Sequence, residues 1–361
     1  MGSFPGSAAE VTAAWLEPHL RCDPAARLVD LRFEPIGTGQ VGDTARFWLD
    51  WDRPDGGPAT VAAKFASHDP TSRATAALFG LYAKEVHFYS EVAPQLAVRT
   101  PRVHASALSE DGARFVLLFE DMGPARSGNQ IAGCTLAEAR AAIVQAAALH
   151  APTWGAPLLD TAPWLQPIPG VAERIASLYP QAHAIFRERY AGLLAPDLMA
   201  VCDGLNARIG AWFGRSPQAR ALCHGDFRLD NMLFDCRGGQ DPIAVVDWQT
   251  CAADCPIKDI AYFLGCGIGS ALRRAHEAEL IALYCAEMRA RGVALTPAAI
   301  RARYRLGALH GVATAVFSAA FVVRTERGDA NFLSMAINSC ELARDCDSLG
   351  ALAALPEDGT C

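Results

Sequence analysis

The chain has 361 residues, which exceeds the usual size of one domain and leaves room for a large buried core. Hydrophobic residues make up 51% and charged residues 20% of it, which excludes a disordered, collagen-like or coiled-coil protein. The formal net charge of −7 argues against a nucleic-acid partner. The N-terminus lacks the basic and apolar regions of a secretory signal, so we expect a cytoplasmic protein.

The first third of the chain has the pattern of an antiparallel sheet. Apolar and polar residues alternate over 44–51, 60–67 and 113–120, and clusters of Gly, Pro or Asp bound each run. Between the second and third runs, the apolar residues of 74–94 recur at helical spacing. We therefore predict a sheet with one inserted helix.

The remainder of the chain has a helical pattern. Thr135 and Glu138 form a capping signature, and Ala-, Leu- and Arg-rich segments occupy 171–215, 271–291 and 297–350. The exception is 221–250, where short strands and loops are expected. The fold class is therefore α+β, with a β-rich lobe over 1–121 that includes an N-terminal helix, and a larger, mostly helical lobe over 122–361.

Two features of the composition have alternative interpretations. The twelve cysteines include no C-x-x-C pair, so buried reduced thiols are favoured over a zinc site. The uncharged stretch 306–323 has the composition of a buried helix, because His310, Thr314, Ser318 and two glycines interrupt a run that is barely long enough to span a membrane. We expect no membrane insertion.

Gly37, Gly39 and Gly42 form a G-x-G-x-x-G run. A dinucleotide fingerprint would open a helix, whereas these glycines precede a predicted strand. A β-hairpin that covers phosphates fits this context, and a glycine-rich turn without a ligand is the alternative.

The next strand contains Lys64 in the sequence Val-Ala-Ala-Lys, where a kinase-type lysine would pair with phosphates. Glu85 follows on the predicted helix, and its carboxylate could hold the ammonium group in place. A lysine and a glutamate in this order indicate more than a surface ion pair.

The strongest signal is the run from His224 to Asn231, which matches H-x-D-x-x-x-x-N with Asp226 as its acidic residue. Such a loop places a carboxylate beside an acceptor hydroxyl and an amide oxygen on a metal ion. Asp247 follows at the end of an apolar strand, where its carboxylate could bind Mg²⁺. Together with the glycine run, Lys64 and Glu85, these residues indicate phosphoryl transfer.

These motifs, followed by Val-Val-Asp-Trp-Gln and Lys-Asp-Ile-Ala-Tyr-Phe-Leu-Gly, resemble those of the aminoglycoside phosphotransferase and choline kinase superfamily. The similarity extends over nearly the whole chain and implies a bilobal protein-kinase-like fold. The nearest branch is the ecdysteroid kinase-like one, together with kinase domains associated with acyl-CoA dehydrogenases. Gly225 stands where protein kinases usually have Arg, and no long activation segment precedes Asp259, so a protein kinase is disfavoured.

The resemblance implies ATP and Mg²⁺ as cofactors and assigns roles to the motif residues. Asp226 would accept or orient the proton of the acceptor hydroxyl, and His224 and Asp259 would brace its loop. The residues implied to contact nucleotide or metal are Gly37, Gly39, Gly42, Lys64, Glu85, Glu120 and Met122 for the nucleotide, and Asn231 and Asp247 for the metal. Arg228 would either neutralise the transferring phosphate or pair with Asp230 or another acid.

The charge of the C-terminal region indicates which class of acceptor it would suit. Residues 271–361 contain ten Arg and ten Asp or Glu, so this region has no acidic excess for a polycation. Its apolar helix and aromatic residues suggest a hydrophobic or hydroxyacyl-type hydroxylated substrate, although the helix could be core only. The alternatives are an aminoglycoside or macrolide phosphotransferase, and a nucleotide-binding pseudokinase without transfer activity. The sequence does not predict the oligomeric state.

Overall fold

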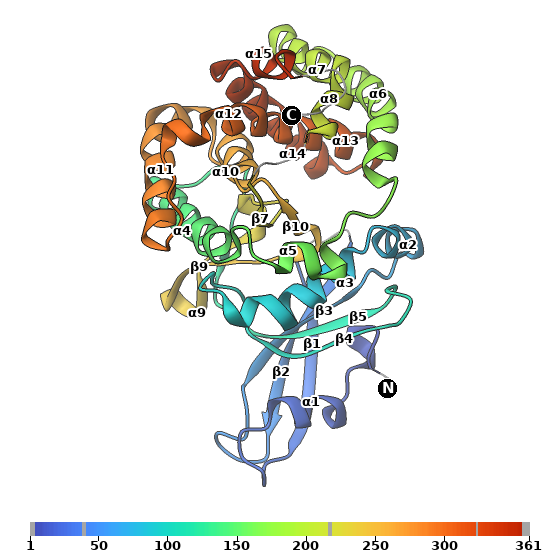
Figure 1. The fold of residues 1–361 in the computed structure, drawn as a ribbon. Helices are drawn as coiled ribbons and strands as arrows, with labels where there is room; N and C mark the ends of the chain where they lie inside the picture. The colour runs from blue at the N-terminus through green and yellow to red at the C-terminus, as the bar shows by residue number, and fades with distance from the viewer. Residues whose placement is uncertain (1–3, 38–40, 216–218, 323, 356–361) are drawn as a thin grey trace. The chain divides into compact units, whose positions relative to one another are not determined.

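The computed structural model describes residues 4–37, 41–215, 219–322 and 324–355 (Figure 1). The chain divides into two compact units. The first comprises Met1–Ala125 and Asp235–Thr250, and the second comprises Arg126–Phe234 and Cys251–Cys361.

The first unit contains a five-stranded antiparallel sheet, drawn in blue and cyan in Figure 1, with the strand order β1-β2-β3-β5-β4. Its strands are β1 (Leu28–Ile36), β2 (Gly42–Trp51), β3 (Thr60–Ala66), β4 (Val103–Leu108) and β5 (Phe115–Glu120). The predicted alternation is observed in β2, where Ala45, Phe47 and Leu49 are buried. The antiparallel sheet and the α+β class are thereby confirmed.

One face of this sheet is covered by helix α1 (Ala13–Leu20), whose first turn is capped by the Thr12 side chain. Leu16 and Leu20 of the helix join a cluster with Phe47 and Phe65 of the sheet. Burial of these apolar side chains fixes the register of β3, the strand that carries Lys64.

The single helix predicted between β3 and β4 is instead two α-helices and a π-helical turn. They are α2 (Pro70–Leu78), α3 (Leu81–His87) and the turn Phe88–Val92. The break is at Gly80, which has a φ of 64°, a left-handed conformation that glycine adopts without strain. The apolar spacing continues across the break, so periodicity alone did not reveal it.

Residues 235–250 belong to the first unit, although the sequence analysis placed them in the helical lobe. This segment contains the short turn α9 (Cys236–Gly239), strand β9 (Asp241–Val245) and a 3₁₀ turn over Trp248–Thr250. The Val245 amide donates to the Arg99 carbonyl at 2.8 Å, and Asp241 accepts from the Arg99 guanidinium at 2.8 Å. These long-range bonds attach Asp247 to the sheet unit.

The second unit is mainly helical, as predicted. Its α-helices are α4 (Leu136–Thr153), α5 (Leu158–Thr161), α6 (Val171–Arg189), α7 (Pro196–Ala207), α8 (Ile209–Gly214), α10 (Ile257–Tyr262), α11 (Ser270–Ala290), α12 (Pro297–Gly307), α13 (Leu309–Phe321), α14 (Glu326–Asp345) and α15 (Ser348–Ala353). Strand β7 (Ala221–Cys223) pairs with β10 (Ala252–Asp254), and β6 (Arg126–Ser127) pairs with β8 (Met232–Asp235). The predicted capping box at Thr135 and Glu138 is present at the start of α4.

Helix α13 occupies the centre of the main core cluster of this unit. Its buried residues Leu309, Val312 and Val316 pack with side chains of α6, α7 and α14. The stretch 306–323 is thus divided between the end of α12 and a thirteen-residue α13. Among the described residues, no helix has both the length and the apolar character needed to cross a bilayer.

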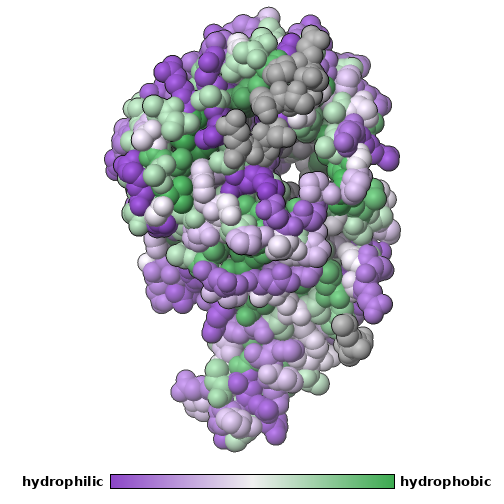
Figure 2. All heavy atoms as spheres, in the orientation of Figure 1, coloured by the Kyte–Doolittle hydropathy of each residue, from purple (hydrophilic) through white to green (hydrophobic). Residues whose placement is uncertain are grey.

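Most of the described cysteines, from Cys22 to Cys346, are buried. Figure 2 shows hydrophilic side chains over much of the visible surface, with hydrophobic ones dispersed among them. The apolar fraction of the chain therefore resides mainly in the cores of the two units.

Candidate active site

In the first unit, Lys64 lies between two carboxylates. Its Nζ atom is 2.8 Å from Glu85 Oε1 on α3 and 2.8 Å from Asp247 Oδ1 after β9. Burial alone would lower the pKa of Lys64, but the charges of Asp247 and Glu85 raise it above its ordinary value. The lysine is therefore a fixed cation.

Glu85 supports this cation from the interior, since its side chain is 1% exposed. Burial raises the pKa of its carboxyl group, and the Lys64 ammonium opposes that increase. The predicted pairing of Lys64 with Glu85 is present in the structure. The contact between Lys64 and Asp247 was not predicted, because sequence reasoning assigned Asp247 to a metal alone.

Asp247 is held in an unusual backbone conformation, with a φ of 66°. The next residue, Trp248, is fully buried, and its ring stacks on Phe88 with a centroid distance of 3.7 Å and an interplanar angle of 9°. The Trp248 indole also donates to the Val245 carbonyl at 3.2 Å. This anchoring supports the left-handed conformation of Asp247.

The glycine run joins β1 to β2, as the hairpin interpretation predicted. Gly39 lies outside the described residues, whereas Gly37 has a φ of 76° that favours glycine. At Gly42 a Cβ atom would come within 2.9 Å of the Phe65 carbonyl oxygen, so a side chain would not fit. Tyr82, which the sequence analysis did not single out, donates to the Val41 carbonyl at 2.6 Å and supports the hairpin from α3.

Glu120 and Met122 lie at the end of β5 and just beyond it. The Glu120 carboxylate accepts hydrogen bonds from Arg99 Nη1 at 2.7 Å and from the Arg102 amide at 2.8 Å. The Met122 carbonyl accepts from the Arg237 amide at 2.9 Å. These bonds connect the end of the sheet to the segment that carries Asp247.

In the second unit, Asp226 is surrounded by three hydrogen-bond donors. Its Oδ2 atom is 2.9 Å from Arg228 Nε and 2.8 Å from Asn231 Nδ2, and its Oδ1 atom accepts from the Tyr262 hydroxyl at 2.9 Å. Burial would raise the pKa of Asp226, but Arg228, with contributions from His224 and Tyr262, lowers it to about 2. Asp226 is therefore an ionised carboxylate at neutral pH.

Arg228 forms ion pairs with Asp226 and Asp230, which is one of the two roles left open for it. Its Nη1 atom also lies 3.1 Å from Asp230 Oδ2 and 3.1 Å from Gln130 Oε1. Gln130 in turn donates its backbone amide to Asp230 at 3.1 Å. Sequence reasoning missed both Gln130 and Tyr262, since neither belongs to the H-x-D-x-x-x-x-N pattern.

The Asn231 amide group is oriented by Asp226. Its nitrogen donates to the Asp226 carbonyl oxygen and to Oδ2, both at 2.8 Å. Because the nitrogen is engaged in this way, the amide oxygen is the atom that could bind a metal ion.

The loop that carries Asp226 is fixed by Asp259 at the start of α10. This buried carboxylate accepts from the backbone amides of His224 at 2.6 Å and Gly225 at 3.1 Å, and His150 Nε2 lies 3.3 Å away. Burial would raise the pKa of Asp259, but the bond from His150 helps to lower it. His224 Nδ1 accepts from the Asp226 amide at 3.3 Å, so its ring braces the loop.

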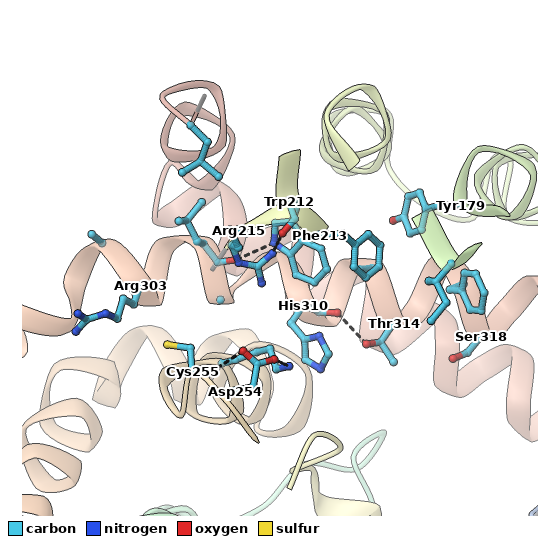
Figure 3. A pocket seen from close by; sticks show the side chains of 18 residues that line it. Tyr179, Trp212, Phe213, Arg215, Asp254, Cys255, Arg303, His310, Thr314 and Ser318 are labelled. Atoms are coloured by element: carbon cyan, nitrogen blue, oxygen red, sulfur yellow. Dashed lines mark hydrogen bonds and ion pairs between the residues drawn. The ribbon is translucent and has the colours of Figure 1, made fainter. Parts of the chain in front are cut away.

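A cavity of about 580 Å³ lies beside this loop, within the second unit (Figure 3). Its walls come from helices α6, α8, α10, α12 and α13, and the side chains of Trp212, Arg215, Asp254 and His310 converge in it. His310 Nε2 lies 3.1 Å from the Gly225 carbonyl oxygen. The His310 ring also packs edge-on against Tyr262 at 4.9 Å, so the cavity wall contacts residues that hold Asp226.

Comparisons with known proteins identify the family of the chain. Residues 43–295, more than half of the chain, match the model of the phosphotransferase enzyme family. No curated protein sequence matches the chain.

Solved structures with a similar fold include a putative aminoglycoside phosphotransferase from Ralstonia eutropha, with 16% identity, a TM-score of 0.52, and coverage of 92% of this chain and 97% of that one. Choline kinase from Cryptosporidium parvum has 11% identity and a TM-score of 0.51, with coverage of 88% and 89%. An aminoglycoside phosphotransferase in complex with GDP and kanamycin has 17% identity and a TM-score of 0.51, with coverage of 90% and 95%. The chain therefore has a kinase-like fold and belongs to the phosphotransferase enzyme family.

Proposed function

We propose that the protein is an ATP- and Mg²⁺-dependent kinase that transfers the γ-phosphoryl group to a hydroxyl of a small, largely apolar molecule. The observation that carries this proposal is the environment of Asp226. Arg228, Asn231 and Tyr262 keep this carboxylate ionised and fixed, so it can accept the proton of an acceptor hydroxyl. Because its pKa lies well below neutrality, Asp226 is ionised at neutral pH and is available to orient the hydroxyl and accept its proton.

Phosphoryl transfer then requires no covalent intermediate with the protein. The acceptor oxygen forms a bond to the γ-phosphorus, the bond from that phosphorus to the bridging oxygen breaks, and ADP leaves with the electron pair. The hydroxyl proton passes to Asp226. Arg228 remains paired with Asp226 and Asp230, which favours a positioning role for it over direct neutralisation of the phosphate.

Lys64 is the residue that we expect to bind the α- and β-phosphates. Its ammonium group has a raised pKa and is held by Glu85 and Asp247, so its charge is fixed before nucleotide binds. Gly37, Gly39 and Gly42 would cover the phosphates, and Glu120 and Met122 would flank the nucleotide base. GTP should be tested beside ATP, because an aminoglycoside phosphotransferase of similar fold was solved in complex with GDP.

The donor atoms of Asn231 and Asp247 suit magnesium. Carboxylate and amide oxygens are hard ligands, and Mg²⁺ takes few protein ligands while it retains waters. Asn231 has its nitrogen committed to Asp226, and the Asp247 side chain is 32% exposed. When bound, the ion would neutralise negative charge on the phosphates.

The cavity beside the Asp226 loop is the proposed acceptor site. Aromatic and aliphatic side chains supply most of its lining, which suits an apolar molecule. Its basic residues, Arg215, Lys258 and Arg303, outnumber the acidic Asp254, so a polycationic aminoglycoside would be poorly accommodated.

The test is to incubate the purified chain with Mg²⁺, ATP or GTP, and a panel of apolar alcohols, and to measure ADP or GDP together with the phosphorylated product. Asp226→Asn should reduce turnover at least about 10³-fold while nucleotide binding is retained, because the amide cannot accept the proton. Unchanged turnover would contradict the role of Asp226. Tight Mg·ATP binding without transfer to any alcohol would favour the pseudokinase alternative.

A further inference from the structure

The charged residues of the cavity are unevenly paired. Lys258 forms an ion pair with Asp254, one turn earlier in the chain. Arg215 and Arg303 also line the cavity, and neither lies within ion-pair distance of a carboxylate in the part of the chain that the structure describes. The cavity therefore has an excess of positive charge.

Arg215 is held in place on the cavity wall. Its guanidinium carbon is 3.8 Å from the centre of the Trp212 ring, and Nη1 donates to the Trp212 carbonyl oxygen. Burial lowers the pKa of Arg215 to about 10, and Asp254 only partly opposes this decrease. A cation in such surroundings costs free energy unless a ligand or partner supplies the opposite charge.

The remainder of the wall is apolar. Tyr179, Phe213, Leu306 and Phe317 are among its lining residues, and they come from helices on several sides of the cavity (Figure 3). The volume of about 580 Å³ lies within the range of small-molecule sites. An apolar enclosure with a preformed guanidinium is complementary to a molecule that has an apolar chain and one anionic group.

We propose that the acceptor is an amphipathic hydroxy acid, whose carboxylate pairs with Arg215 and whose apolar chain lies along the aromatic wall. This proposal rests on the proposed function, since it names the substrate class of the same site. Arg303, on α12, adds positive potential at the edge of the cavity and extends away from Arg215 in Figure 3. The acceptor hydroxyl would lie toward His310, the wall residue that contacts the Asp226 loop.

The experiment measures binding without catalysis. Three probes of equal length, 10-hydroxydecanoate, 1,10-decanediol and 10-amino-1-decanol, are titrated into the full chain by calorimetry in the absence of nucleotide. We expect the acid to bind at least about tenfold more tightly than the amine, with the diol between them. Equal affinities, tighter binding of the amine, or no binding of any probe would overturn the proposal.

Variants of Arg215 test whether this residue causes the preference for the acid. Arg215→Gln should weaken binding of the acid at least about tenfold and leave the diol unchanged, and Arg215→Lys should restore part of the affinity. Arg301→Gln is the control for the loss of one arginine charge, because Arg301 is an exposed residue of α12 that lines a different cavity. If the folded Arg215→Gln variant still prefers the acid, the assignment to Arg215 is wrong.

The outcomes also separate this proposal from the proposed function. Efficient ATP-dependent phosphorylation of the diol or the amine, with no preference for the acid, would overturn the hydroxy-acid proposal and leave the kinase activity established. A preference for the acid that depends on Arg215, without phosphoryl transfer to any alcohol, would overturn the kinase function and leave an anion-binding cavity.

Discussion

The pairing of Asp226 with Arg228 predicts a specific change in the pH dependence of activity. Arg228→Gln removes the cation beside the carboxylate and keeps a hydrogen-bond donor. Two unit charges about 4 Å apart interact by about 4 kcal/mol at an effective dielectric constant of about 20. One pKa unit corresponds to about 1.4 kcal/mol, so the loss of this cation should raise the pKa of Asp226 by about 3.

The pKa of Asp226 in the native protein is about 2, so the variant should have a value near 5. Below that pH the carboxyl group is protonated and cannot accept the acceptor's proton. The activity of Arg228→Gln should therefore fall between pH 6 and pH 4, roughly the range around the new pKa of Asp226. In the native enzyme, protonation of Asp226 should not reduce activity in that range.

The assay is the pH profile of kcat/KM for ADP release, with stability checked at each pH. Arg327→Gln is the control, because Arg327 lies 3.6 Å from Asp230 and is more than half exposed, and no bond connects it to Asp226 in the described structure. The reasoning would be refuted if the native enzyme and Arg228→Gln lost activity over the same acidic pH range. It would also be refuted if Arg327→Gln shifted the pH profile as much as Arg228→Gln does.

Three further predictions concern binding and stability. Lys64→Met should raise the KM for ATP at least about tenfold. It should also lower the free energy of unfolding by about 3 kcal/mol, because the buried Glu85 loses its cation. Nucleotide titration and denaturant unfolding measure these two quantities, and unchanged values would refute the prediction. Asp259→Asn should cost about 3 kcal/mol of stability by weakening the bonds to the Asp226 loop, and a loss below about 1 kcal/mol in urea unfolding would contradict this. Thr135→Ala should cost about 1 kcal/mol through loss of the capping box, measured by thermal unfolding, whereas Thr135→Ser should retain stability.

Much of the fold was predictable because its elements carry local signals. The alternation in β2 and β3 and the capping box of α4 are properties of neighbouring residues, and the structure confirms them. The division of α2 from α3 was not predicted. Gly80 allows the chain to turn there, yet a glycine within an apolar helical pattern is compatible with a continuous helix.

The candidate site was predictable only where its residues belong to a motif. Lys64 and Glu85 were paired from their order and setting, and their contact is present. Asp247 reaches Lys64 because β9 is bonded to Arg99, which is a contact between distant parts of the sequence. Tyr262 lies within a quoted motif, but its bond to Asp226 depends on how α10 packs, and no spacing rule supplies that information.

The conformation of the Asp226 loop has a consequence for regulation. Gly225 has a φ of 82°, which disfavours the side chain that protein kinases have at this position. Its amide is bonded to Asp259 and its carbonyl to His310, so both backbone polar groups of Gly225 are committed to core helices. The loop is therefore ordered by burial and fixed hydrogen bonds, and it needs no phosphorylated segment to position Asp226.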